Sequence, residues 1–134
     1  MKTKITLFLV VLTILIACQQ KSADGPKIKK GMIKVTILYP NAEGKTFDMD
    51  YYSNKHMPMV ASLLGDSLKL ISIDKGLAST VPDTPVPYLA AGYLYFETMS
   101  AFQNSMGPNS AKLQADIPNY TNIQPVVQIS EVVQ

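Results

Sequence analysis

Hydrophobic and polar positions follow three different patterns along the chain. Ile5–Ala17 is an uncharged, mostly aliphatic run of 13 residues that follows Lys2 and Lys4. A helix of that length spans about 20 Å, which is short of a bilayer core of ~30 Å. A charged start and a short apolar run are typical of a secretory signal peptide, so we expect residues 1–17 to be one.

The end of this run carries the only cysteine of the chain. Leu15-Ile16-Ala17-Cys18 resembles a bacterial lipobox, in which the cysteine is lipidated and becomes the new N-terminus. The resemblance implies an exported lipoprotein anchored to the cell-envelope membrane through Cys18. The residue after the cysteine is Gln19 rather than Asp. In Gram-negative bacteria this resembles the pattern of lipoproteins that are sent on to the outer membrane. The other interpretation is a buried N-terminal helix with an incidental cysteine.

Residues 18–31 are predicted to be the lipidated cysteine and a flexible tether. From Gln19 the segment is polar, contains Gly and Pro, and has almost no apolar residues to bury. Its charges give a net of +3, so it could lie on anionic headgroups or serve as a plain spacer.

Residues 32–134 change to short periodic patterns. Met32–Tyr39 alternates as a strand does, and Leu68–Leu77 does the same. Tyr88–Phe96 is uninterrupted and apolar, as in a strand buried on both faces, and Gln124–Val133 reads as a last strand. A proline-rich loop is expected over 78–87.

Two helices are predicted between these strands. The first is capped by Asp48 and ends at Gly65, and Pro58 predicts a kink or break near His56. Its apolar residues form one stripe at spacings of three and four: Met49, Tyr52, His56, Met59 and Leu63. Thr98 caps a second helix that we expect to end at Gly107-Pro108. Residues 109–122 are predicted to be irregular, with a short helix at most over 110–115.

The order of elements predicts an α+β fold, a ferredoxin-like βαββαβ sandwich with both helices on one face of an antiparallel sheet. About 100 residues leave the other sheet face in need of cover. Dimerisation through that face would supply it, so we expect a homodimer.

Two motifs in this domain resemble the EthD family. One is Phe47-Asp48-Met49-Asp50-Tyr51-Tyr52 followed by His56-Met57-Pro58, and the other is Ala115-Asp116-Ile117-Pro118-Asn119-Tyr120-Thr121. The resemblance implies a dimeric α+β barrel, close to cofactor-free oxygenases, muconolactone-type isomerases and polyketide cyclases. Some members are labelled reductases, but an exported protein would lack ready access to soluble NADPH.

Three residues are the candidates for catalysis. His56 is the only histidine and would be the acid/base, because imidazole moves protons near neutral pH. Asp116 would be its partner and Tyr52 a hydrogen-bond donor. The alternatives are a core histidine held by one hydrogen bond and an Asx-turn aspartate.

Four more residues are predicted to line a pocket for an apolar or aromatic ligand: Tyr39, Met59, Tyr93 and Tyr120. The alternative is that they serve core and dimer packing. The function expected is an oxidoreductase-type or isomerase-type enzyme, or an accessory to one, acting on a small hydrophobic molecule without a cofactor. The other hypothesis is a non-catalytic binding module for such a molecule.

The composition of the chain excludes some kinds of site and partner. One His and one Cys exclude a zinc site built from several such ligands, and we expect no metal. All 12 basic residues are Lys, and residues 32–134 hold 6 Lys against 9 acidic residues. A mildly acidic domain without Arg argues against a nucleic-acid partner.

Overall fold

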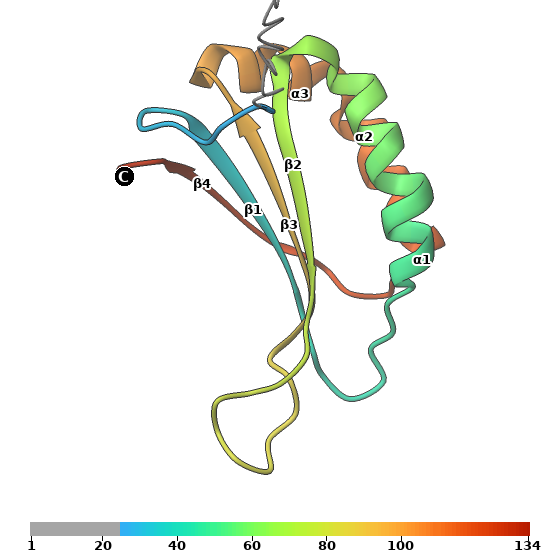
Figure 1. Ribbon diagram of the computed structural model, residues 1–134. Coiled ribbons are helices and arrows are strands. Elements are labelled where there is room, and N and C mark those ends of the chain that lie inside the picture. Colours follow the sequence, from blue (N-terminus) through green and yellow to red (C-terminus); the bar gives the residue numbers. More distant parts are fainter. Residues whose placement is uncertain (1–24) are drawn as a thin grey trace, which may run out of the picture.

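A four-stranded antiparallel sheet in the order β2-β3-β1-β4 carries the helices on one face (Figure 1). The computed structural model describes residues 25–134. The predicted signal peptide, Cys18 and residues 19–24 of the predicted tether lie outside the described residues. The strands are β1 (Ile33–Pro40), β2 (Leu68–Lys75), β3 (Tyr88–Phe96) and β4 (Val126–Glu131), and the α-helices are α1 (Met49–Tyr51), α2 (Met57–Leu64) and α3 (Met99–Asp116). The predicted ferredoxin-like α+β fold is confirmed.

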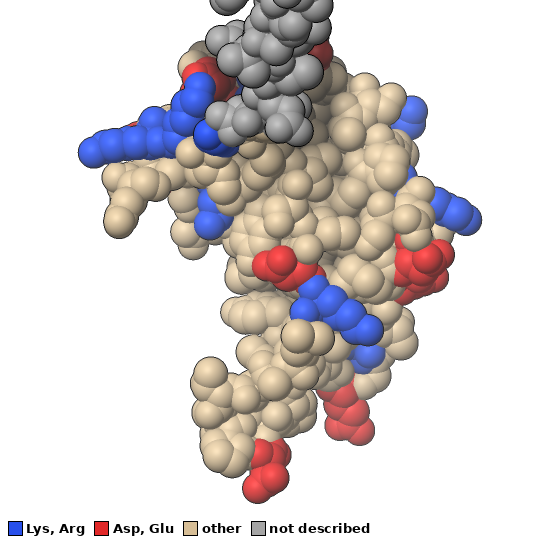
Figure 2. Space-filling model, in the orientation of Figure 1, with Lys and Arg blue, Asp and Glu red and all other residues tan. Residues whose placement is uncertain are grey.

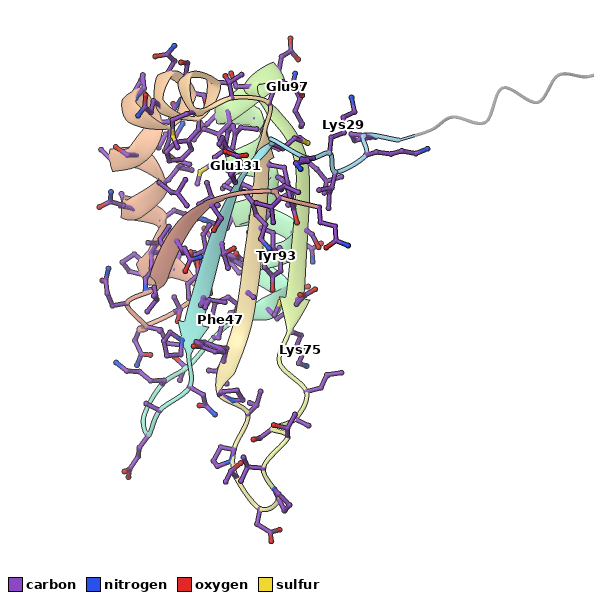
Figure 3. All side chains as sticks on the ribbon, turned by 90° about the vertical axis from the view of Figure 1, so that its left-hand side faces the viewer. Lys29, Phe47, Lys75, Tyr93, Glu97 and Glu131 are labelled. Atoms are coloured by element: carbon purple, nitrogen blue, oxygen red, sulfur yellow. The ribbon has the colours of Figure 1, made fainter. Side chains whose placement is uncertain are left out.

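Strand register assigns each side chain to a sheet face. Val35 pairs with Leu94 and Tyr39 with Ala90, and these side chains pack under the helices. The alternate residues of each strand point to the other face, where Thr36 pairs with Tyr93. Figure 3 looks onto this open face, with Tyr93 in its centre. The bounds of β3 agree with the prediction, while β2 and β4 are shorter than expected.

The first helix contains the predicted irregularity, in the form of a π-helical turn over Tyr52–His56. In this turn the Met57 N–H donates to the Tyr52 carbonyl, five residues back. The extra residue shifts the buried face, which continues through Met57, Val60 and Leu64. The predicted stripe through Met59 and Leu63 is therefore wrong by one position.

Both ends of this helical segment lie at the residues that the sequence predicts. The Asp48 side chain accepts a hydrogen bond from the Tyr51 N–H at 2.9 Å, as an N-cap does. Gly65 ends α2 with φ of +52°, a backbone conformation that favours glycine.

The second helix does not end at Gly107-Pro108, and this prediction is wrong. Helix α3 is continuous for 18 residues with Pro108 inside it. Side chains support the backbone around the proline: Ser105 Oγ donates to the Ala101 carbonyl at 2.7 Å, and Asn109 Nδ2 donates to Ser105 O and Leu63 O. The last of these bonds also fastens α3 to α2. Tertiary contacts thus outweigh the proline signal.

Between sheet and helices lies a core rich in aromatic rings. Tyr39, Phe47, Tyr52 and Tyr120 meet edge-on or tilted, with centroid distances from 4.7 to 6.0 Å. The visible surface mixes Lys with Asp and Glu, without a field of one sign (Figure 2). Within residues 25–134, no helix has the length and apolar character needed to cross a membrane.

Candidate functional site

The two sequence motifs come together at one end of the helix layer. Phe47 forms an isolated antiparallel bridge with Thr121, and the Asp48 N–H donates to the Tyr120 carbonyl at 2.7 Å. This contact brings the start of the first helical segment against the segment that follows α3. His56 and Asp116, 60 positions apart, are thereby placed side by side.

His56 and Asp116 form a hydrogen-bonded pair. His56 Nδ1 lies 2.8 Å from Asp116 Oδ2, and His56 is almost fully buried. The π-helical turn puts His56 beneath Tyr52, and their rings are nearly parallel at 5.6 Å. The ring of the only histidine is thus fixed in position by a stacked neighbour and a carboxylate.

Asp116 is held by two further donors. Tyr51 Oη donates to Asp116 Oδ1 at 3.0 Å, and Asn119 Nδ2 donates to the same oxygen at 2.8 Å. Burial alone would raise the pKa of Asp116, but hydrogen bonds from His56, Asn119 and Tyr51 outweigh it and hold that pKa below its ordinary value. An ionised Asp116 can only accept, so the proton of this hydrogen bond lies on Nδ1, and Nε2 is the ring nitrogen that faces away from Asp116.

The other ring nitrogen of His56 faces the Tyr120 hydroxyl, which in turn meets the Tyr39 hydroxyl. Tyr120 Oη lies 3.4 Å from His56 Nε2 and 2.9 Å from Tyr39 Oη. Burial is the main cause that raises the pKa of both Tyr39 and Tyr120 above the ordinary value. Both phenols therefore stay neutral at ordinary pH. Asp116, His56, Tyr120 and Tyr39 form one continuous hydrogen-bonded chain.

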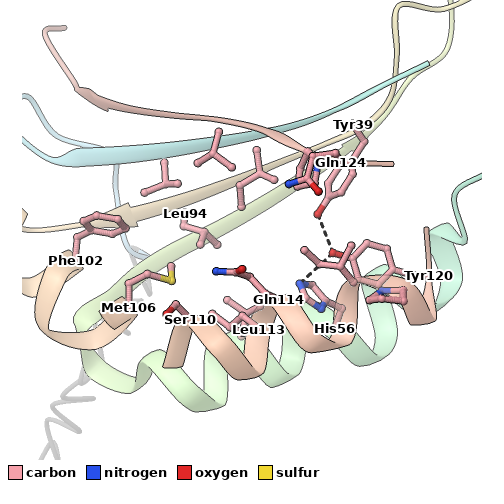
Figure 4. Close-up of a pocket in the computed structure, with 17 residues that line it drawn as sticks. Tyr39, His56, Leu94, Phe102, Met106, Ser110, Leu113, Gln114, Tyr120 and Gln124 are labelled. Atoms are coloured by element: carbon pink, nitrogen blue, oxygen red, sulfur yellow. Dashed lines mark hydrogen bonds between the residues drawn. The ribbon is translucent and has the colours of Figure 1, made fainter. Parts of the chain in front are cut away.

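This chain opens into a cavity of about 530 Å³ between α3 and strands β1, β3 and β4. Figure 4 shows His56, Tyr120 and Tyr39 at one end and Phe102 and Met106 at the other. Most of the wall is apolar, and its aliphatic residues include Val35, Ile37, Val60, Leu94, Leu113 and Val127. A volume of this size suits a small organic molecule. The arrangement can bind an apolar body and exchange a proton at its polar end.

Tyr52, Met59 and Tyr93 take no part in lining this cavity. The Tyr52 hydroxyl is fully buried without a hydrogen-bond partner, and a Cβ at Gly92 would stand 2.3 Å from it. Met59 on α2 is only partly buried. Tyr93 lies on the open sheet face, where Lys34 Nζ is 5.2 Å from its ring centroid. The structure brings together His56, Asp116, Tyr39 and Tyr120 from the predicted set.

Sequence reasoning did not single out four side chains of the site. Tyr51 and Asn119 hold Asp116, and Gln114 and Gln124 line the cavity. Asn119 follows Asp116 by three residues, which is a signal for a local hydrogen bond. Nothing in the sequence marks the two glutamines. Among residues 25–134 there is no group of three or more His, Cys, Asp or Glu side chains placed to hold a metal ion.

Solved structures define the class of the protein. An EthD-like protein from Ralstonia eutropha JMP134 is 40% identical, with a TM-score of 0.74 over 79% of this chain and 96% of that one. A protein of the ethyl tert-butyl ether d (EthD) family from Bacillus halodurans C-125 is 19% identical, with a TM-score of 0.54 over 75% and 97%. A dimeric protein of unknown function and ferredoxin-like fold from Bacteroides fragilis NCTC 9343 is 10% identical, with a TM-score of 0.51 over 76% and 97%. The class is that of the ferredoxin-like α+β proteins.

The family model named EthD domain matches residues 43–124, which include both motifs and the whole hydrogen-bonded chain except Tyr39. This chain belongs to the EthD domain family. No curated protein matches it.

Proposed function

We propose that this EthD-domain protein carries out proton transfer on a small, mainly apolar compound, with His56 as the acid/base and Asp116 as the group that orients it. The observation that carries the proposal is the 2.8 Å His56–Asp116 pair on the wall of an apolar cavity of about 530 Å³. A carboxylate on Nδ1 fixes the tautomer that leaves Nε2 basic, and it stabilises the imidazolium formed when Nε2 takes a proton.

The reaction class follows from what this site holds. Removing a proton from an activated hydroxyl leaves an anion, and His56 can return the proton to a different atom, which is an isomerisation. The same anion can instead pass electrons to dissolved O₂, which is an oxidation without a bound cofactor. Either reaction fits an oxidoreductase-type or isomerase-type enzyme, or an accessory to one.

One compound separates these outcomes. 1,4-Dihydroxynaphthalene can tautomerise to its diketone, or it can lose two electrons and two protons to O₂, giving the quinone and hydrogen peroxide. Proton NMR follows the first reaction and an oxygen electrode the second. We expect acceleration of one of them by the wild-type protein and its loss in His56→Ala and Asp116→Ala, with Tyr88→Phe, which alters an exposed ring on β3, as the control.

The folded state of each variant is checked by circular dichroism. Folded variants that keep full turnover would contradict the roles of His56 and Asp116. Retention of the compound by the wild-type protein without turnover would favour the other hypothesis, a binding module for a hydrophobic small molecule.

The same chain is proposed to be an exported lipoprotein. Leu15-Ile16-Ala17-Cys18 supports lipidation of Cys18 and attachment to the cell-envelope membrane, and Gln19 supports the outer membrane. Cys18→Ala should move the protein from the membrane to the soluble fraction, whereas Ser22→Ala should leave it at the membrane. Unchanged fractionation of Cys18→Ala would contradict the anchor.

A homodimer through the open sheet face is proposed as well. Homologues of this fold are dimeric proteins, and Tyr93 stands at the centre of the open face (Figure 3). Sedimentation should give a dimer for the wild type and a monomer for Tyr93→Glu. A dimer in both would place the interface elsewhere.

A further inference from the structure

The hydrogen-bonded chain at the cavity has a direction, which Asp116 sets. A carboxylate only accepts hydrogen bonds, so the proton between Asp116 and His56 belongs to Nδ1. Nε2 of the neutral ring then has a lone pair and no proton. When the ring is neutral, the Tyr120 hydroxyl, 3.4 Å away, is the one group of this pair with a proton to give, so it is the donor to Nε2. This donation leaves the Tyr120 oxygen as an acceptor.

The next link continues in the same sense. Tyr39 Oη is 2.9 Å from Tyr120 Oη, and since the Tyr120 proton is directed to His56, Tyr39 is the donor. The Tyr39 oxygen then has no proton to offer, but it retains a lone pair for an incoming donor. Tyr39 lines the cavity, so the chain presents an acceptor to the ligand (Figure 4).

Charge in the cavity points to the same conclusion. Apart from His56, the lining has no ionisable side chain other than the two tyrosines, and among the described lining residues there is no Lys, Asp or Glu. A carboxylate or phosphate would enter without a cation to pair with, and a buried unpaired charge is costly. The uncharged amides of Gln114 and Gln124 and the hydroxyl of Ser110 complete the polar lining, and each can both donate and accept hydrogen bonds.

We propose that the cavity selects uncharged apolar compounds that bear a hydroxyl able to donate a proton, such as phenols and enols, and rejects carboxylates of the same shape. This inference rests on the proposed function, since it concerns the same cavity. The ligand O–H donates to Tyr39. When it ionises, its O–H bond breaks, one proton moves along each link from Tyr39 to Tyr120 to His56, and an Nε2–H bond forms beside Asp116.

Three probes with one bicyclic body test the selection on the wild-type protein at neutral pH. 2-Naphthol has a hydroxyl donor, 2-methoxynaphthalene has the oxygen without the proton, and 2-naphthoate has the charge. Equilibrium dialysis measures each Kd. We expect 2-naphthol to bind at least about fivefold more tightly than 2-methoxynaphthalene, because one hydrogen bond is lost and a buried acceptor is left unpaired. 2-Naphthoate should bind weakest.

A variant tests the direction of the chain. Tyr39→Phe removes the terminal acceptor, so the preference for 2-naphthol over 2-methoxynaphthalene should fall to about one while 2-methoxynaphthalene binds as before. Tyr88→Phe is the matched control and should keep the preference. Near-ultraviolet circular dichroism checks that both variants fold, and the comparison of the three probes needs no variant.

Equal or tighter binding of 2-methoxynaphthalene or 2-naphthoate by the wild type would overturn the selection, as would the absence of binding by all three up to their solubility limits. A preference that survives in folded Tyr39→Phe would overturn the role of Tyr39. None of these measurements depends on turnover. A protein that prefers 2-naphthol but converts no substrate would refute only the proposed catalysis.

Discussion

The two faces of the sheet place chemically similar residues in different surroundings. Tyr39 on β1 points under the helices, is 2% exposed and ends the hydrogen-bonded chain that starts at Asp116. Tyr93 on the adjacent strand β3 points to the open face, is partly exposed and has Lys34 over its ring. Both are tyrosines that sequence reasoning assigned to a ligand pocket. Strand parity, more than residue type, decides which of them meets the cavity.

The difference between the faces predicts different responses to mutation. The helix face is packed, and among the described residues its buried side-chain polar atoms other than the Tyr52 hydroxyl are hydrogen-bonded, so changes there alter both stability and the site. The open face has charged and hydroxylated residues that tolerate change in a single copy of the chain. The predictions that follow test this contrast, beginning with the largest expected effect.

Removal of a core ring on the helix face should have the largest effect. Phe96 is fully buried and meets Phe102 edge-on at 5.4 Å. Phe96→Ala should lower the free energy of unfolding by about 3–5 kcal/mol. Thr36→Ala on the open face should change it by no more than about 0.5 kcal/mol. Urea denaturation at a protein concentration low enough to keep the chain monomeric measures both, and equal losses would contradict the contrast between faces.

Glycines allow a finer test of packing. A Cβ at Gly92, on the helix face of β3, would stand 2.3 Å from Tyr52 Oη and 2.8 Å from Met57 Cε. Gly92→Ala should therefore destabilise the protein by about 1–3 kcal/mol. Gly107 in α3 has nothing within 4 Å of such an atom, so Gly107→Ala should stabilise it by about 0.5–1 kcal/mol. Thermal unfolding gives the sign of each change.

Acid titration separates the buried pair from surface carboxylates. The pKa of Asp116 is lower in the folded protein than in the unfolded chain, so its contribution to stability is complete above the unfolded pKa, near 4, and is lost as pH falls through the folded pKa. Asp116→Asn should therefore flatten the loss of stability below about pH 4. Asp66→Asn, at an exposed site, is the matched control for removal of a carboxylate. Urea denaturation across this pH range measures both slopes.

Much of the fold could be predicted because the local pattern of apolar and polar residues in a strand indicates which of its faces are buried. Alternation in Ile33–Pro40 and the apolar run of Tyr88–Phe96 each reflect one repeated geometry. The course of the helices was harder to predict at their two prolines. Pro58 predicted an irregularity but not the extra residue that rotates the stripe, and Pro108 predicted an end that Asn109 and the packing of α3 on α2 override.

For the site, the sequence offered residue types without contacts. The pairing of His56 with Asp116 was predictable from the two motifs of the family that both belong to. The bond between Tyr39 and Tyr120 joins positions 81 apart, and it depends on the Phe47–Thr121 bridge that no local pattern encodes. Gln114 and Gln124 enter the site only because α3 continues past Pro108 and the chain then turns back to β4.

Replacement of Tyr52 by Phe should have the smallest effect on stability. Its hydroxyl is the buried side-chain polar atom without a partner among the described residues, beside Gly92. Removing an unpaired buried hydroxyl relieves a desolvation cost, so Tyr52→Phe should leave the free energy of unfolding unchanged or raise it by about 0.5 kcal/mol. Tyr39→Phe breaks a paired hydroxyl and should lower it by about 1 kcal/mol. If Tyr52→Phe instead loses turnover at unchanged stability, the hydroxyl donates to the reacting molecule, as the sequence predicted, through a movement toward the cavity.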